Sequence, residues 1–167
     1  MSVAEHKATS PASAPCFVLT VSDSRTIATE TSGQAIVELL EAAGHTVIER
    51  QVVKDEPAEV RRIVEDEVRR MRARVMITTG GTGVTSRDST YEALVGIFDK
   101  RLDGFGELFR MLSYQEIGSA AMMSRAIAGV AGHCAIFLLP GSEAAVRLAM
   151  TKLILPELGH LMRELNR

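Results

Sequence analysis

Short runs of apolar and β-branched residues recur along the chain, and each run stops at a polar or glycine-rich segment. Runs of this kind are typical of strands buried in a sheet. Five of them predict strands: residues 16–21, 46–53, 75–79, 124–130 and 135–140. The second run is mixed in polarity, which predicts a position nearer a sheet edge. A short Ala-Gly-His turn separates the last two runs.

Between these runs, apolar residues recur three and four positions apart, as on the buried face of a helix. One helix is predicted over 33–44, with Thr31 or Ser32 as its N-cap and Gly44 as its end. A second helix begins at Pro57, a residue that suits the first helical position. Its predicted inward-facing residues are Val60, Ile63, Val64, Val68 and Met71.

Three more helices are predicted in the second half of the chain. Ser89 and Glu92 have the spacing of a capping box at the start of the first of them. The next helix is entered through a flexible Gly-Phe-Gly at 104–106. The last helix, over 141–165, contains Pro156, which interrupts or kinks it.

Strands that alternate with helices predict an α/β fold with a mostly parallel sheet covered on both faces. Nothing divides residues 16–167, so we expect a single domain there. It follows a tail, 1–15, whose Ser, Ala and Pro content predicts a disordered or loosely held segment. Ligands of such folds bind beyond the carboxyl ends of the strands. Three loops qualify: Ser22–Ser24, 80–83 and 140–142.

Composition narrows the possible partners. The 167 residues are 46% apolar and 24% charged, with a formal net charge of −2, which gives no reason to expect nucleic acid or an anionic membrane as a partner. No apolar run approaches the roughly 20 residues of a membrane span, and the N-terminus lacks the features of a signal peptide. Cys16 and Cys134 lie beside apolar runs, which predicts buried, reduced thiols of a cytoplasmic protein. The four histidines show no metal-ligand spacing.

The turn at 80–83, Gly-Gly-Thr-Gly, follows a predicted strand and precedes a predicted helix. Glycines let backbone N–H groups approach a ligand closely, so this arrangement can bind an anion. It is not a nucleotide P-loop, because Gly83 is followed by Val84 where the motif needs Lys, and it lacks the third glycine of a dinucleotide site, where Ser86 stands. A generic anion-binding turn, or merely a tight connection, remains.

Two acids, Asp55 and Asp88, stand just before predicted helices. The simpler interpretation of each is a favourable interaction with the helix dipole. In the same way, Ser142 can be no more than an N-cap. Two acids and two anion-binding turns at one sheet edge favour a functional site, without naming a reaction.

Seven stretches of the sequence together resemble one family. They are VSDSRT (21–26), SG (32–33), DE (55–56), TTGGTGVTSRD (78–88), GFGELFRMLSYQEIG (104–118), SRAIAGV (124–130) and LPGS (139–142). In this order they are similar to the MoaB/MogA family of molybdenum cofactor biosynthesis, and the long fifth and sixth stretches are closer to the MoaB branch. The resemblance implies a three-layer α/β/α domain that assembles as a homotrimer or homohexamer.

The resemblance also implies an activity, the adenylylation of molybdopterin by Mg-ATP with release of pyrophosphate. Asp55 and Asp88 are then catalytic and hold or orient Mg²⁺, which usually binds one or two carboxylates together with phosphates. Substrate contacts are expected from eight residues: Gly80, Gly81, Thr82, Gly83, Gly141, Ser142, Ser22 and Asp23.

Two other functions stay open: a molybdopterin-binding or carrier protein without turnover, and an unrelated nucleotide-binding α/β protein that binds no pterin. Glu107 either lines the cleft or is only an acid in the first turn of a helix. Phe105, Phe109, Met111 and Leu112 form either a subunit contact or part of the core.

Overall fold

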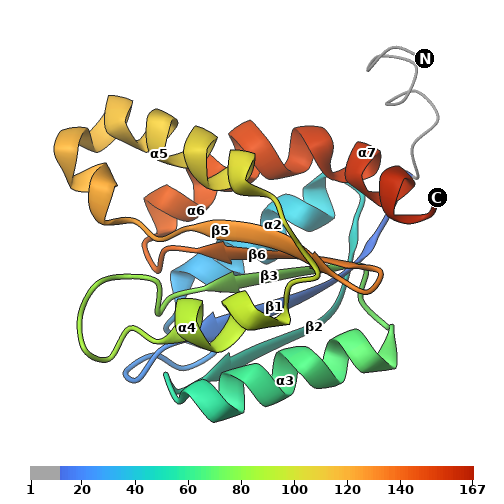
Figure 1. Cartoon of the computed structure of the whole chain (residues 1–167), viewed down its shortest axis with the longest axis horizontal. Coiled ribbons are helices and arrows are strands. Elements are labelled where there is room, and N and C mark those ends of the chain that lie inside the picture. The colour runs from blue at the N-terminus through green and yellow to red at the C-terminus, as the bar shows by residue number, and fades with distance from the viewer. Residues whose placement is uncertain (1–11) are drawn as a thin grey trace.

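The computed structural model describes residues 12–167, which form a six-stranded sheet between two layers of helices (Figure 1). The strands are β1 (Pro15–Val21), β2 (Thr46–Val53), β3 (Val75–Thr79), β4 (Lys100–Arg101), β5 (Ile127–Ala131) and β6 (Cys134–Leu139). Their order in the sheet is β2-β1-β3-β6-β5-β4. The first four strands in this order are parallel, and β5 is antiparallel to both of its neighbours. The predicted mostly parallel sheet is therefore confirmed, with β2 at an edge.

The central strands contribute side chains to two separate cores. In β1, Cys16 and Val18 pack in one core, whereas Phe17 and Leu19 pack in the other. Alternate residues of a strand point to opposite faces, so a strand covered on both faces has a continuous apolar sequence. Cys16 and Cys134 are free and buried, as predicted, and burial raises the pKa of each thiol to about 12.

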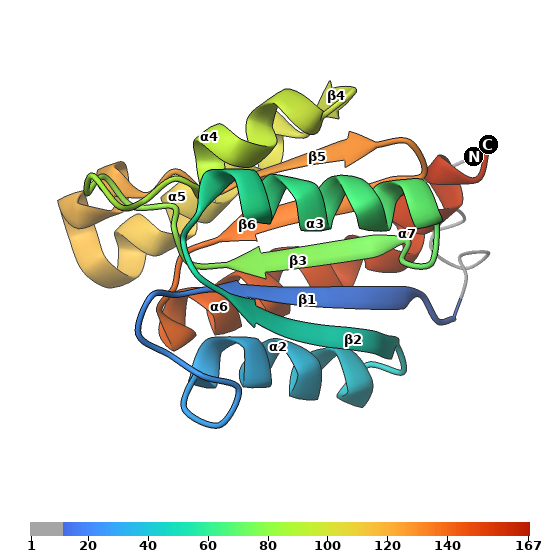
Figure 2. The same ribbon diagram turned by 90° about the horizontal axis from the view of Figure 1, so that it is seen from below.

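The helices are α2 (Thr31–Ala42), α3 (Pro57–Arg70), α4 (Thr90–Leu94), α5 (Asp103–Ile117), α6 (Glu143–Ala149) and α7 (Leu155–Leu165). Helices α2, α5, α6 and α7 cover one face of the sheet, and α3 and α4 cover the other (Figures 1 and 2). The predicted three-layer α/β/α fold is confirmed. Short 3₁₀ turns follow α4 and α5, at Val95–Ile97 and Gly118–Met123.

The last helix is interrupted where we expected it. A π-helical turn, Met150–Ile154, joins α6 to α7, and Pro156 lies in the first turn of α7. Proline removes one backbone donor and crowds the preceding turn, which accounts for the irregularity. Within residues 12–167, no helix has the length and apolar character needed to cross a membrane.

The predicted start of α2 is wrong by one or two residues. The N-cap is Glu30, whose carboxylate accepts a hydrogen bond from the Gly33 N–H at 2.7 Å, and not Thr31 or Ser32. The longer side chain of Glu30 reaches the same backbone donor that a Ser or Thr cap would bind. The predicted end is correct, because Gly44 has a left-handed φ of +86°.

The predicted capping box of α4 does not form. Ser89 is the N-cap by position, but its hydroxyl donates to Asp55 instead of bonding the helix. Glu92 pairs with Arg125 instead of reaching back to the helix start. Both side chains have long-range partners that the local spacing does not reveal.

Two other predictions about helices need correction. Helix α5 begins at Asp103, so the glycines at 104–106 are helical and not a flexible entry. A Cβ on Gly106 would lie 2.7 Å from the Ala126 carbonyl oxygen, so this glycine permits close packing of α5 against the chain entering β5. Met71 does not face inward: it ends α3 with a φ of +57° and is 62% exposed.

The N-terminal segment joins the fold earlier than predicted. β1 begins at Pro15, and Ala14 is buried. The Ala14 N–H donates to His45 Nδ1 at 3.2 Å, and its carbonyl accepts from the Thr46 N–H at 3.1 Å. Ala14 and Pro15 therefore belong to the fold and not to the tail that we expected over 1–15, of which residues 1–11 lie outside the described part of the chain.

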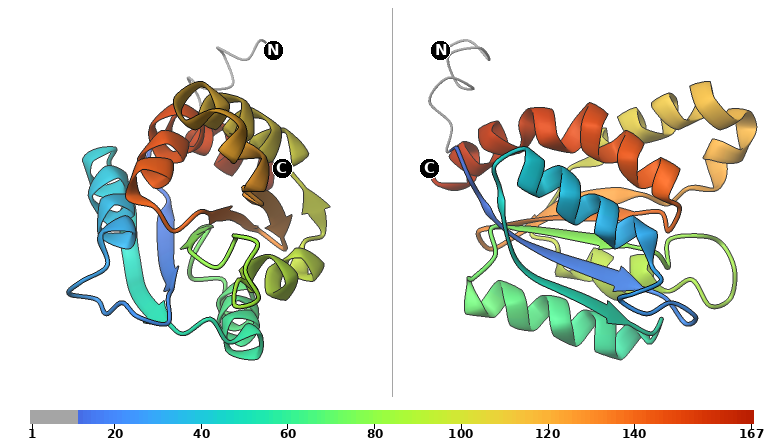
Figure 3. Two further views of the ribbon diagram at one scale, coloured as in Figure 1. Left: turned by 90° about the vertical axis from the view of Figure 1, so that its left-hand side faces the viewer. Right: turned by 180° about the vertical axis from the view of Figure 1, so that it is seen from behind.

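The parallel strands bring four loops to one end of the sheet, on the left of Figure 1. These are the loops after β1, β2, β3 and β6: residues 22–30, 54–56, 80–89 and 140–142. The left panel of Figure 3 views this end directly. Because β5 is antiparallel to β6, the chain that enters β5 lies at the same end.

Candidate functional site

A polar cavity of about 310 Å³ lies over the carboxyl ends of β1, β3 and β6. Four of the residues expected to bind substrate line it: Ser22, Gly80, Gly141 and Ser142. Most of the other lining residues carry a hydroxyl or a carboxylate: Thr20, Ser24, Glu30, Thr31, Ser32, Thr79 and Glu143. The other six predicted residues do not line this cavity. Gly81, Thr82, Gly83 and Asp88 belong to the loop after β3, residues 80–89, which we call the glycine loop, and Asp23 and Asp55 belong to the loops after β1 and β2.

Gly80 and Gly141 bring two backbone segments into contact at the floor of this polar cavity. A Cβ on Gly141 would lie 3.4 Å from the Gly80 Cα, and a Cβ on Gly80 would overlap the Val21 carbonyl. Gly80 also has a φ of +94°, a conformation that favours glycine. Its N–H donates to the Leu139 carbonyl at 3.1 Å. Glycine at position 80 thus allows the ends of neighbouring strands to pack closely, and its N–H, which belongs to the sheet, is not the phosphate donor that we expected.

Two serines fix the loop after β6. The Ser142 hydroxyl accepts a hydrogen bond from the Ala145 N–H at 3.3 Å, so Ser142 is the N-cap of α6, as its position predicted. Ser32, at the start of α2, donates to the Gly141 carbonyl at 2.6 Å. The loop is therefore anchored to both helices that border the polar cavity.

Two buried polar residues in the polar cavity were not predicted. Thr20 is 5% exposed, and its hydroxyl has no hydrogen-bond partner within the described residues. Glu30 accepts from Gly33 and forms an ion pair with Arg50. Leaving a buried hydroxyl unpaired costs about 1–3 kcal/mol. Thr20 therefore carries an unpaired buried hydroxyl next to this cavity, against Gly33 at the start of α2.

Asp55 lies against the glycine turn and is only 6% exposed. Its carboxylate accepts a hydrogen bond from the Ser89 hydroxyl. A Cβ on Gly81 would lie 2.7 Å from Asp55 Oδ2, and Gly81 has a φ of +69°. Glycine at this position therefore allows both the turn and the approach of the carboxylate. The Asp55 N–H donates to Asp23 Oδ1 at 3.1 Å, which joins the loops after β1 and β2.

Asp88 is bound by the loop that it closes. Its Oδ2 accepts hydrogen bonds from the Thr85 N–H at 2.9 Å and the Thr85 hydroxyl at 2.6 Å. The Thr85 hydroxyl, the N–H groups of Thr85 and Gly83, and the positive charge of Arg125 hold the pKa of Asp88 below its usual range. The Asp88 carboxylate therefore takes up the N–H groups at this end of the loop, which a phosphate would otherwise bind.

Asp55 and Asp88 are neighbours through Ser89, which follows Asp88 in the chain and donates to Asp55. Each carboxylate already has at least one hydroxyl partner. Within residues 12–167, no three His, Cys, Asp or Glu side chains gather in a way that could hold a metal ion. Two carboxylates from two neighbouring loops are enough for Mg²⁺ only when a substrate supplies further oxygen ligands.

Asp23, which we expected to contact substrate, is paired with Arg87. Arg87 Nε lies 3.0 Å from Asp23 Oδ2, and Arg87 Nη2 lies 3.1 Å from Asp23 Oδ1. These bonds lower the pKa of Asp23. Arg87 also donates to the Asp55 carbonyl at 3.2 Å and to Glu56 at 3.3 Å. Arg87 therefore links the glycine loop to the loops after β1 and β2.

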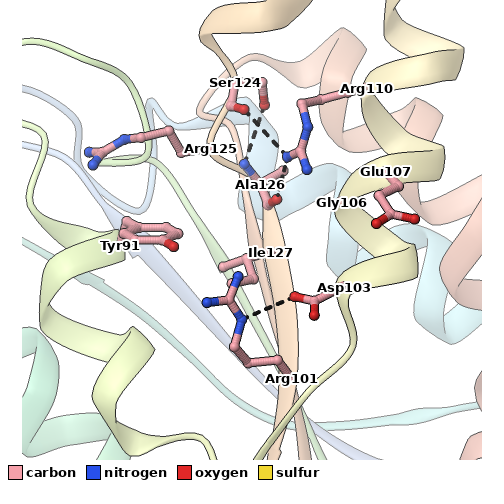
Figure 4. Close-up of a pocket in the computed structure, with 10 residues that line it drawn as sticks. All are labelled: Tyr91, Arg101, Asp103, Gly106, Glu107, Arg110, Ser124, Arg125, Ala126 and Ile127. Atoms are coloured by element: carbon pink, nitrogen blue, oxygen red, sulfur yellow. Dashed lines mark hydrogen bonds and ion pairs between the residues drawn. The ribbon is translucent and has the colours of Figure 1, made fainter.

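A larger cavity of about 660 Å³ lies beside α4, α5 and the start of β5 (Figure 4). Three arginines line it: Arg101, Arg110 and Arg125. Arg101 pairs with Asp103 at 3.0 Å, and Glu107 lines the cavity, in agreement with one of its two interpretations. Arg125 extends from this cavity to the glycine loop, where its Nε donates to the Gly83 carbonyl at 2.9 Å. The glycine loop therefore contacts the walls of both cavities.

Comparison with known proteins shows which family shares this arrangement. The family profile described as "Probable molybdopterin binding domain" matches residues 17–160. Molybdenum cofactor biosynthesis protein B of Bacillus anthracis is 51% identical, in an alignment that covers 100% of this chain and 99% of that protein. This chain belongs to the MoaB/MogA family.

Solved MoaB structures have the same fold. A crystal structure of Molybdenum cofactor biosynthesis protein B is 50% identical with a TM-score of 0.91, and covers 95% of this chain and 99% of its own. The tungsten cofactor synthesizing protein MoaB of Pyrococcus furiosus is 36% identical with a TM-score of 0.83, and the match covers 94% of this chain and 99% of that protein. A MogA structure is 30% identical with a TM-score of 0.81, and the match covers 90% of this chain and 99% of that protein. Membership in the family, and greater similarity to these MoaB proteins than to that MogA, confirm the prediction of a MoaB-type protein of molybdenum cofactor biosynthesis.

Besides Glu30, three residues of this MoaB-type site were not predicted from the sequence: Arg87, Arg125 and Thr20. Arg87 and Arg125 fall inside stretches that carry the family resemblance, and that was their only signal. Thr20 lies within the apolar run of β1, where threonine is common because it suits strands. Their partners are loops distant in sequence, so only the fold reveals what they bind.

Proposed function

We propose that this chain adenylylates molybdopterin with Mg-ATP, forming adenylyl-molybdopterin and pyrophosphate. The observation that carries the proposal is the glycine loop, which contacts one cavity on each side and has two carboxylates against it. Adenylyl transfer brings two phosphate-bearing molecules together in line, and two cavities that meet at one anion-binding turn suit such a reaction.

In this proposal Asp55 and Asp88 would hold the magnesium ion. The approach of Asp55 Oδ2 to Gly81, at a place that a Cβ would fill, leaves a carboxylate oxygen close to the turn. Magnesium, when bound with ATP, neutralises phosphate charge and orients the reacting groups. The residues of the chain position the phosphates: backbone N–H groups of Gly81 and Thr82, and the start of α6 at Ser142.

One observation favours the alternative of a molybdopterin-binding or carrier protein without turnover. Both carboxylates already accept hydrogen bonds, Asp55 from Ser89 and Asp88 from Thr85. A carrier needs the two acids only for these hydrogen bonds, which shape the loop. The two functions differ in their need for ATP, since a carrier binds the pterin equally well without it.

The test is an assay of the purified protein with molybdopterin and Mg-ATP, in which adenylylated pterin and pyrophosphate are both measured. Asp55→Ala and Asp88→Ala should abolish product, whereas Asp66→Ala should not. Asp66 is a matched control because it pairs with Arg62 on α3, away from the cavities. Saturable pterin binding without product from the parent protein would replace the enzyme with the carrier.

Self-association is a further part of the proposal. Exposed apolar side chains gather on α5 and the 3₁₀ turn that follows it: Leu108, Met111, Tyr114, Ile117, Met122 and Met123. Of the four residues that we expected in either a contact or the core, Phe109 is buried, Phe105 and Leu112 pack partly on the core, and Met111 is exposed. Contiguous exposed apolar surface marks an interface in many proteins.

We propose that this α5 surface forms the contact of a homotrimer or homohexamer. In light scattering, Ile117→Glu should shift the parent oligomer toward the monomer. Met71→Glu is the control, since Met71 is also exposed but lies at the end of α3. A monomeric parent protein, or an unchanged mass for Ile117→Glu, would rule out this surface as the contact.

A further inference from the structure

Three carbonyl groups of the glycine loop point at one side chain. Arg125 Nε donates to the Gly83 carbonyl at 2.9 Å and to the Thr82 carbonyl at 3.4 Å. Its Nη2 donates to the Asp88 carbonyl at 3.3 Å. Arg125 enters the loop from the strand β5 side, and so binds the start and the end of segment 82–88 at once.

The other side of the same loop faces a carboxylate. A peptide group is planar and trans, so its carbonyl and its N–H point in opposite directions. When the Thr82 carbonyl turns toward Arg125, the N–H of Gly83 turns away from it, toward Asp88. In agreement with this, a Cβ on Gly83 would lie 2.7 Å from Asp88 Oδ2. The guanidinium and the carboxylate therefore hold one peptide group from its two sides.

We infer that Arg125 is a positioning residue, which fixes the carbonyl side of the glycine loop and thereby sets where the Asp88 carboxylate lies. Arg125 is itself fixed by α4, because it forms an ion pair with Glu92 and its guanidinium carbon lies over the Tyr91 ring, 5.1 Å from the ring centroid. A planar guanidinium has five donors in a rigid arrangement and can bind several carbonyls together with a carboxylate. A lysine ammonium at this place has fewer donors and a less defined geometry.

The effect of Arg125 on turnover depends on the proposed function, but its effect on the loop does not. The first test is therefore hydrogen exchange of the backbone over 82–89 in Arg125→Met and Arg125→Lys. We expect roughly tenfold faster exchange in the Met variant and an intermediate rate in the Lys variant. Arg74→Met is the matched control, since Arg74 donates to the His133 carbonyl at 2.9 Å at the opposite end of β3. Unchanged exchange in Arg125→Met would overturn the inference.

The second test asks whether Arg125 acts through Asp88. Arg125→Met should lower kcat by about 10²-fold, the loss typical of a slightly misplaced reacting group, with little change in KM for ATP. Guanidinium ion should restore part of the turnover of Arg125→Ala. The double variant Arg125→Met/Asp88→Asn should be no slower than Asp88→Asn alone. Losses that multiply in the double variant would overturn the inference. A parent protein without turnover would refute the proposed function and leave the decision to hydrogen exchange.

Discussion

Replacing Asp88 by Asn separates the two roles open to this residue, closure of the glycine loop and action on the substrates. The carboxylate accepts from the Thr85 N–H at 2.9 Å and the Thr85 hydroxyl at 2.6 Å. Hydrogen bonds to charged groups contribute about 1.5–3 kcal/mol, and Asn loses the charge but keeps one acceptor oxygen. Because Asp88 is also only partly buried, we expect Asp88→Asn to lower the free energy of unfolding by about 1 kcal/mol.

A loss of that size cannot abolish activity by unfolding the protein. Domains have about 5–15 kcal/mol of stability, so after the substitution only about one molecule in a thousand or fewer would be unfolded. Removing a group that stabilises the transition state, in contrast, slows reactions by about 10²–10³-fold. The proposed function therefore predicts that Asp88→Asn loses turnover on that scale while it stays folded.

Thr85→Val is the matched control, because it removes the hydroxyl donor and leaves the carboxylate in place. We expect a similar loss of about 1 kcal/mol in urea unfolding but, in the pyrophosphate assay, a much smaller loss of turnover than in Asp88→Asn, because the Thr85 N–H still holds the carboxylate. Equal loss of turnover in both variants would show that Asp88 only closes the loop, and would refute this reasoning.

The same pair of proteins has a pH signature. The folded-state pKa of Asp88 is lowered from the ordinary value of 3.8, so its carboxylate stabilises the folded state above that pH and loses this effect as the pH falls through the folded-state pKa. The difference in unfolding free energy between the parent and Asp88→Asn should therefore be constant from about pH 5 to about pH 8 and shrink below pH 3.8. A constant difference down to acid unfolding would contradict the assigned hydrogen bonds.

Two further substitutions test the packing of the loops. Gly81→Ala places a side chain on a backbone with a φ of +69° and against Asp55. It should therefore lower the free energy of unfolding by at least about 1 kcal/mol and also lower turnover. Gly104→Ala is the control, because its Cβ would contact nothing within 4 Å, and its Tm should be unchanged or slightly higher. Glu30→Ala removes the buried partner of Arg50. The free energy of unfolding, measured in urea, should fall by about 3 kcal/mol. A loss below about 1 kcal/mol would show that the ion pair does not stabilise the fold.

Most of the fold follows from local sequence because the signals are local. The continuous apolar sequence of β1 and the mixed polarity of β2 indicate which strand is central and which lies at an edge. The one strand missed, β4, has two residues and depends on pairing with β5. The helix ends failed where a side chain had a distant partner, as at Ser89, whose hydroxyl binds Asp55 from 34 positions away in the sequence.

The site could be predicted only as a set of loops. Parallel strands bring the loops after β1, β3 and β6 together, and Ser22, Gly80 and Ser142 indeed line one cavity. Which side chains of these loops form hydrogen bonds with one another depends on their length and direction in space, and the spacing of residues in the sequence does not determine either. Asp23 was thus assigned to the substrate although it pairs with Arg87, and Arg125, whose loop partners lie 37 to 43 positions away, was not singled out.

The two acids serve different halves of the glycine turn. The N–H of Gly80 belongs to the sheet, and the N–H of Gly83 faces the Asp88 carboxylate. A phosphate on this turn must therefore bind its middle, near Gly81, where Asp55 approaches from the protein side. In the proposed function, Asp55 would then hold the magnesium ion beside that phosphate, whereas Asp88 shapes the second half of the turn and would reach the ion only from there. Loss of Asp55 should accordingly weaken ATP binding, while loss of Asp88 should mainly lower kcat.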